Sequence, residues 1–60
     1  MKVLCTRNDS KSLPFSVNGL YSVDRVHGGG LYDIVTFDGS KIQAPLQGHY
    51  LDFIVVEDIQ

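Results

Sequence analysis

The sequence lacks the covalent and metal-based means by which many very small domains are stabilised. Its sixty residues form one domain at most, 1–60, and Cys5 is its only cysteine, so an internal disulfide cannot form. A lone cysteine also argues against a structural zinc site. Because a chain of this length buries only about 60% of the surface that its unfolded form exposes, stability must come from packing or from a partner.

Other absences exclude classes of function. No stretch approaches the ~18 consecutive apolar residues of a membrane-spanning helix. The apolar stretch after Met1 and Lys2 is too short for a secretory signal, so we expect a cytoplasmic protein that does not contact a membrane. Five Lys and Arg stand against seven Asp and Glu, for a net charge of −2. This balance disfavours nucleic-acid binding by bulk electrostatics.

The apolar residues that are present are typical of sheet structure. Many are β-branched or aromatic, and no segment of ten or more residues has helical periodicity, so we expect an all-β chain. Turn signals such as Asn18-Gly19 and Asp38-Gly39 separate the expected strands. These strands are Lys2–Thr6, Leu20–Val26, Leu31–Phe37, Lys41–Ala44 and Phe53–Glu57.

The connections suggest that these strands close into a small five-stranded barrel. Residues 46–50 are too few for an α-helix and fit a single 3-10 turn before the last strand. In such a barrel the first and last strands pair, which leaves fewer exposed sheet edges. This pairing would also place the early basic residues near the late acidic ones, namely Lys2, Arg7 and Lys11 near Asp52, Glu57 and Asp58. We expect Gly39 to require a positive φ, and the three consecutive glycines at 28–30 to tolerate substitution.

Alternation separates an expected core from an expected surface. Val23, Ile42 and Val55 should face the interior, and the aromatic rings of Tyr21 and Phe37 should belong to the core. Two other aromatic residues lie in irregular segments beside polar residues. We therefore expect Phe15 and Tyr50 to be exposed, where aromatic side chains can anchor a partner.

The order of several segments resembles a family of small SH3-like barrel proteins found in bacteriophages and bacteria, mostly without an assigned function. The matching segments are KVLC at 2–5, FSVNGLYSV at 15–23, LYDIVTFDG at 31–39 and YLDFIVVE at 50–57. The chain departs from the family in having Asn18-Gly19 where a Gly-Lys pair is usual, and it lacks aromatic residues before Pro45. The resemblance implies an SH3-like barrel and a phage or prophage gene, hence the host cytoplasm.

No motif in the chain predicts catalysis. The segment His27-Gly28-Gly29-Gly30 resembles an oxyanion-hole motif, but the nucleophile elbow that this motif accompanies is missing. It cannot act as a phosphate loop either, because a strand rather than a helix follows it. Cys5, His27 and His49 are far apart in sequence, and whether they meet in the fold stays open. We expect no enzyme activity, no metal and no cofactor.

These observations predict a protein-interaction module. If the resemblance to phage proteins holds, the chain is an accessory protein that binds and modulates a host protein. Loops at one end of the barrel, 10–18, 27–30 and 46–50, would bind it, with Phe15, His27, His49 and Tyr50 as anchors. Two alternatives stay open: a barrel associated with nucleic acid or ribonucleoprotein, and a self-assembling structural component. The partner, the outcome of binding and the oligomeric state are not fixed by the sequence.

Overall fold

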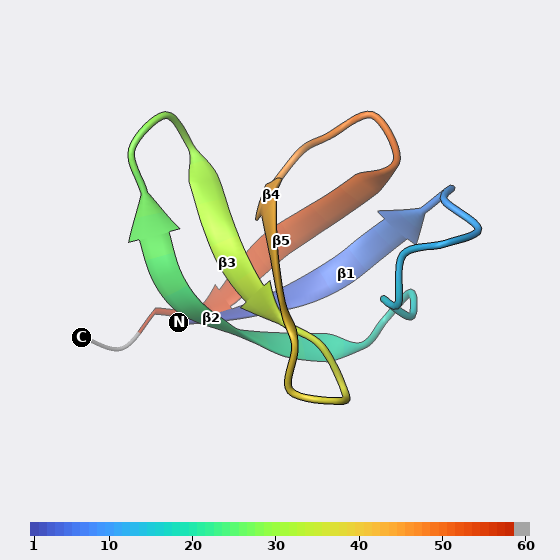
Figure 1. Cartoon of the computed structure of the whole chain (residues 1–60), viewed down its shortest axis with the longest axis horizontal. Helices are drawn as coiled ribbons and strands as arrows, with labels where there is room; N and C mark the ends of the chain where they lie inside the picture. The colour runs from blue at the N-terminus through green and yellow to red at the C-terminus, as the bar shows by residue number, and fades with distance from the viewer. Residues whose placement is uncertain (59–60) are drawn as a thin grey trace.

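The computed structural model describes residues 1–58 as five antiparallel strands in one sheet (Figure 1). The strands are β1 (Lys2–Asn8), β2 (Leu20–His27), β3 (Leu31–Val35), β4 (Lys41–Pro45) and β5 (Leu51–Glu57). Their order in the sheet is β4-β3-β2-β1-β5, so the first and last strands are neighbours, as expected. The all-β prediction is confirmed, and each strand lies within two residues of its predicted bounds.

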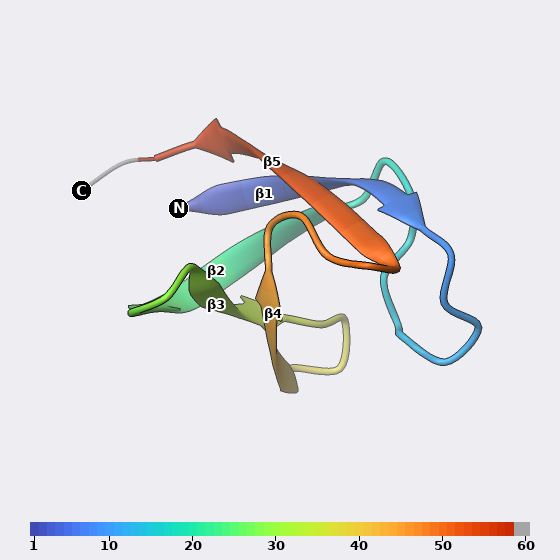
Figure 2. The same cartoon turned by 90° about the horizontal axis from the view of Figure 1, so that it is seen from above.

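Strand β2 belongs to both halves of the sheet. Its first residues, Leu20–Ser22, pair with β1, and the stretch from Val23 to His27 pairs with β3. A register irregularity between Val23 and Arg25 marks the change, and bulges of this kind bend and twist a strand. The sheet therefore folds over itself, with β1 and β5 in one layer and β3 and β4 in the other (Figure 2).

The segment between β4 and β5 differs from the prediction. Gly48 N donates to Leu51 O at 2.8 Å, and Phe53 N donates to Leu46 O at 2.7 Å, so residues 46–48 run antiparallel beside residues 51–53. The predicted 3-10 turn is wrong: the segment folds back on itself as a tight hairpin, and residues 1–58 contain no 3-10 turn. Strands β4 and β5 lie at the two edges of the sheet, which is open between them.

The folded sheet encloses one apolar core. Within residues 1–58, the buried apolar side chains are Val3, Cys5, Phe15, Tyr21, Ile34, Ala44, Leu51 and Phe53. Val23 and Ile42 are half-buried and pack against this core, in agreement with the alternation. The ring of Phe15 meets Tyr21 and Phe53 edge to face, with centroids 4.9 and 5.3 Å away. Such aromatic pairs add roughly 0.5–1.5 kcal/mol beyond burial.

Three expectations about burial are wrong. Phe15 is only 4% exposed, because the loop between β1 and β2 inserts its ring into the core. Phe37 is 75% exposed, because β3 ends at Val35 and the buried side chain beyond it is Thr36. Val55 is 42% exposed, because it lies in the second half of β5, where all side chains from Ile54 to Glu57 are exposed. Tyr21 is buried, as predicted.

The hairpin between β3 and β4 depends on Asp38. Its Oδ1 accepts hydrogen bonds from the Thr36 hydroxyl and, at 3.0 Å, from Ser40 N. The Thr36 bond, followed by the bonds from Ser40, lowers the pKa of the Asp38 carboxyl to about 2. Gly39 follows with φ 88°, which confirms the positive φ expected there.

We predict that Phe15→Ala destabilises the domain by about 3–5 kcal/mol, since it removes a buried ring and leaves a cavity. Because so small a domain has only ~3–5 kcal/mol of stability, this variant should be largely unfolded. Val55→Ala, at a half-exposed site, should cost less than about 1 kcal/mol. Thermal melts followed by circular dichroism compare the two. Similar melting temperatures would contradict the placement of Phe15 in the core.

Gly39 and Gly28 provide a matched pair for backbone strain. A Cβ at either position would meet nothing within 4 Å, but only Gly39 has a positive φ. Gly39→Ala should therefore cost roughly 1–2 kcal/mol, whereas Gly28→Ala should be close to neutral. The tolerance expected of the whole triplet is wrong for Gly29 and Gly30, whose φ values are 79° and 80°. Equal denaturation midpoints for the two variants would disprove the difference.

A pH titration tests the Asp38 hairpin. The carboxyl pKa is lowered from 3.8 to about 2 in the folded state. The stabilisation that it provides is therefore complete above about pH 4 and disappears as the pH falls through 2. Carbon-detected NMR of the Asp38 carboxyl should give a midpoint near 2 in the native chain. In Thr36→Val the pKa should rise toward its ordinary value; an unchanged midpoint would exclude the Thr36 bond as the cause.

Candidate functional site

An open groove of about 250 Å³ lies between the β1–β2 loop and the segment that joins β4 to β5. Leu13 forms one wall, and residues from the end of β4 to the start of β5 form the other. The residues that line it are Leu13, Ala44, Pro45, Gly48, His49, Tyr50 and Leu51. The lining contains no Asp, Glu, Lys or Arg. The groove therefore offers apolar surface with two polar side-chain groups, the Tyr50 hydroxyl and the His49 imidazole.

The structure brings together two of the four predicted anchors. His49 and Tyr50 are exposed side chains of the groove, with ring centroids 6.5 Å apart. Tyr50 is 61% exposed, which agrees with the prediction for this residue. Phe15 is buried, and the carbonyl oxygen of its own residue accepts a 2.6 Å bond from Asn8 Nδ2. Phe15 therefore fixes the β1–β2 loop to the core, and its ring is not accessible to a partner.

His27 lies elsewhere, at the turn between β2 and β3. In both views of the whole chain this turn is on the opposite side from the β1–β2 loop (Figures 1 and 2). The expectation that three loops share one end of the barrel is wrong for residues 27–30. His27 Nε2 is 2.8 Å from Asp33 Oδ1, within ion-pair distance when the imidazole is protonated, although the two atoms are not aligned as a hydrogen bond.

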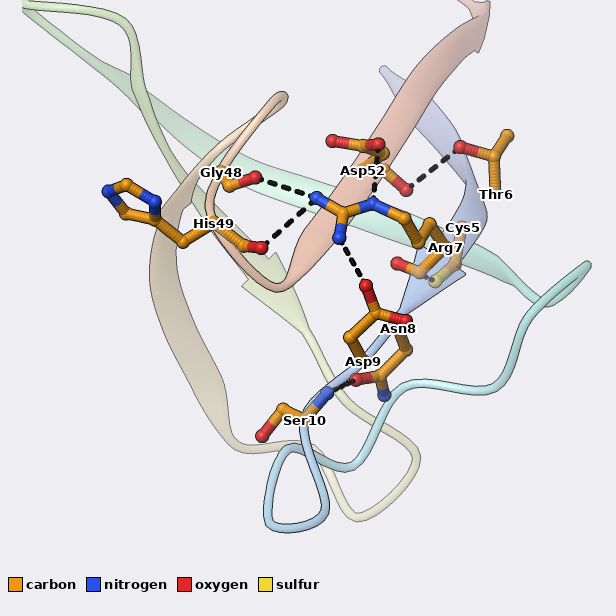
Figure 3. Close-up of polar contacts among 9 residues, drawn as sticks. All are labelled: Cys5, Thr6, Arg7, Asn8, Asp9, Ser10, Gly48, His49 and Asp52. Carbon is orange, nitrogen blue, oxygen red and sulfur yellow. Dashed lines mark hydrogen bonds and ion pairs between the residues drawn. The ribbon is translucent and has the colours of Figure 1, made fainter.

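Arg7 is the polar centre behind the second wall (Figure 3). Its Nε donates to Asp52 Oδ2 at 2.8 Å, and its Nη1 donates to Asp9 Oδ2. Its Nη2 donates to two consecutive carbonyls of the loop, Gly48 O at 2.9 Å and His49 O at 3.2 Å. The imidazole of His49 points away from the guanidinium. The hydrogen bonds to Asp52 and Asp9 raise the pKa of Arg7 further, so the guanidinium stays charged.

The neighbours of Arg7 hold the rest of both walls. Asp9 N donates to Tyr50 O at 2.8 Å, so each of the three carbonyls from Gly48 to Tyr50 has a partner at the end of β1. Asn8 Nδ2 donates to Leu13 O and Phe15 O, at 3.2 and 2.6 Å, and Asn8 Oδ1 accepts from Ser10 N. Three consecutive residues therefore contact both sides of the groove.

The thiol of Cys5 is inaccessible in the folded domain. Cys5 is fully buried in the core, and this burial raises the pKa of its thiol. A raised pKa disfavours the nucleophilic thiolate. Residues 1–58 contain no group of three His, Cys, Asp or Glu side chains that could hold a metal ion. The same part of the chain contains no helix able to cross a membrane.

Sequence reasoning placed Arg7 near Asp52, which the 2.8 Å bond between them confirms, but it did not assign Arg7, Asn8 or Leu13 to the site. All three lie in or beside a polar loop, where charged and amide side chains are usually exposed to solvent. Three of the four partners of Arg7, namely Asp52, Gly48 and His49, are more than 40 residues away in sequence. One signal was present: Asn and Asp beside a strand end commonly bond to nearby backbone. That signal predicts the bond from Ser10 N to Asn8, but nothing in the sequence predicts the bonds from Arg7 to the carbonyls of Gly48 and His49.

The comparisons with known proteins give a family and no activity. No curated protein and no solved structure matches this chain. A family model described as "Domain of unknown function (DUF7244)" matches residues 1–57, almost the whole chain. The chain therefore belongs to the family of proteins that carry the domain of unknown function DUF7244.

Proposed function

We propose that this domain is a non-catalytic protein-interaction module that receives one bulky apolar side chain of a partner protein in the groove beside Tyr50. The observation that carries the proposal is the groove itself, an apolar depression whose polar backbone groups are already bonded to the end of β1. Exposed aromatic residues beside such a depression are typical anchors of protein interfaces.

The strand arrangement supports an SH3-like barrel as the scaffold. The five strands form two layers that share β2, and the first strand lies between β2 and the last. The bond from Phe53 N to Leu46 O links the end of the β4 segment to β5, on the side where the sheet is open. In this scaffold the loops carry the binding residues, while the strands supply a rigid core.

The size of the groove favours a side chain over a small-molecule ligand. Pockets for drug-sized ligands and cofactors usually have volumes of ~300–1,000 Å³, whereas this groove has about 250 Å³ and is open. Pro45 lacks a backbone N–H, and the carbonyls of residues 48–50 are occupied. A partner therefore finds few backbone groups for strand pairing here and must bind through apolar contact.

Charge distribution makes the nucleic-acid alternative the weaker one. The chain has a net charge of −2, and Arg7 is engaged by Asp52 and Asp9. Lys41 pairs with Asp24 at 2.9 Å, and this bond lowers the pKa of the Asp24 carboxyl. Two of the five basic side chains are thus already paired with carboxylates, so few remain for phosphate contacts.

A role in modulating a host protein follows from the resemblance to phage and bacterial barrel proteins. An accessory protein that acts by binding needs a preformed surface and no reactive group, and the buried Cys5 is consistent with that requirement. The proposed compartment is the cytoplasm of the host.

A random-peptide display library, selected on the purified domain, tests the binding function without a known partner.

In that experiment, enriched peptides should share a bulky apolar residue. Their addition to ¹⁵N-labelled domain should shift the amide resonances of residues 13, 44 and 48–51. Leu4 pairs with Leu20 on β2 and with Ile54 on β5, and the last two are exposed, so these three form an apolar patch outside the groove. Shifts confined to this patch would contradict the assignment of the groove as the binding site. Salt-dependent binding to oligonucleotides in place of peptides would favour the nucleic-acid alternative.

We predict that Tyr50→Ala weakens binding of the selected peptide by about tenfold or more, the usual cost of removing an aromatic anchor. The melting temperature should stay nearly unchanged, because Tyr50 is 61% exposed. Phe37→Ala is the matched control, since Phe37 is an aromatic residue that is 75% exposed and lies outside the groove. Isothermal titration calorimetry with both variants makes the comparison. An equal loss of affinity in both would show that the groove does not determine binding.

A further inference from the structure

Both walls of the groove are attached to one short piece of chain. Arg7 and the amide of Asp9 contact the wall that carries His49 and Tyr50, and Asn8 contacts the wall that carries Leu13. These residues occupy the last two positions of β1 and the position after it. The start of β1 pairs with both β2 and β5, and its last two residues pair with β5, opposite Asp52 and Leu51, so the end of the strand is held in the sheet.

We propose that Arg7 is a positioning residue, which fixes the second wall of the groove before any partner arrives. The proposal rests on the proposed function of the groove and deepens it: the partner meets a preformed surface and binds with little rearrangement. A rigid site avoids the entropic cost of ordering a loop on binding. Without Arg7, residues 46–50 would carry this cost, because their other backbone bonds to the rest of the chain are limited to those of Leu46 O, Gly48 N and Tyr50 O.

The chemistry of the side chain explains why an arginine is needed. Three of its nitrogens contact four acceptors, which belong to Asp9, Gly48, His49 and Asp52. A guanidinium presents its donors in a planar fork, which allows it to bridge carboxylates and carbonyls at the same time. A lysine ammonium has three donors on a single nitrogen, so it could not reach two carboxylates and two carbonyls at the same time.

The carboxylates in turn fix the arginine. Asp52 lies in β5 and is about one-third exposed, whereas Asp9 lies in the loop and is well exposed. Asp52 therefore holds the guanidinium against the sheet. Asp9 binds the guanidinium from the loop through its carboxylate, while its backbone amide donates to Tyr50 O. The side chain thus joins a strand, a loop and the groove wall.

Hydrogen exchange in the free domain tests the proposal without any partner. In Arg7→Met, the amides of Asp9 and Gly48 should exchange about tenfold faster or more. Asp9 N donates to Tyr50 O and Gly48 N donates to Leu51 O, and both bonds should open more often once residues 48–50 are no longer held by Arg7. The amide of Cys5, which donates to Gly19 O within the core, should report global stability in the same sample. Arg7→Lys, the gentler change, should also accelerate exchange at Gly48. Arg25→Met, an exposed arginine on β2, is the control and should leave both loop amides unchanged.

Affinity for the selected peptide supplies the second readout. Arg7→Met and Arg7→Lys should each weaken binding about tenfold, although Arg7 does not line the groove. Loop amides that exchange at the native rate in both Arg7 variants would overturn the proposal, even if Tyr50→Ala weakens binding as expected. If the library yields no peptide, the proposed function fails, and the exchange experiment still decides whether Arg7 holds the wall.

Discussion

The hydrogen bonds donated by Arg7 are the interaction on which the proposed binding surface depends. They join β5, through Asp52, to the two carbonyls that shape the loop beside Tyr50. A chain of sixty residues with one cysteine has no disulfide to hold such a loop. Charge-assisted hydrogen bonds take over that task here, because they are both stronger and more directional than neutral ones. The loop is therefore held by hydrogen bonds from a side chain at the end of β1.

The core and the groove are parts of one structure. Phe15 leaves the loop to pack edge-on against Tyr21 and Phe53, and its carbonyl oxygen is held by Asn8. The same loop presents Leu13 to the groove. A domain of sixty residues has few residues that serve packing alone, so the loop that completes the core also forms a wall of the groove. Changes in the core near Phe15 should consequently reach the groove, whereas changes near His27 should not.

Local sequence signals predicted most of the fold because strands and tight turns are local features. Asp38-Gly39 marks the turn of a hairpin, and alternation places Val23 and Ile42 toward the core. The signals failed where a residue outside a strand fills space between strands, as Phe15 does, and where a strand ends early, as β3 does before Phe37. The site was predicted only in its exposed members, His49 and Tyr50. Pairing of the first and last strands placed Arg7 near Asp52, but its bonds to the carbonyls of Gly48 and His49 could not be predicted, since they depend on how residues 46–50 fold back.

The central claim is that the wall formed by residues 48–50 is rigid in the free domain. Backbone ¹⁵N relaxation on the native chain measures this directly. We predict order parameters of about 0.8 or higher for Gly48, His49 and Tyr50, close to the values of rigid strands. Values below about 0.6, typical of a flexible loop, would contradict the claim and show that the groove forms only when a partner binds.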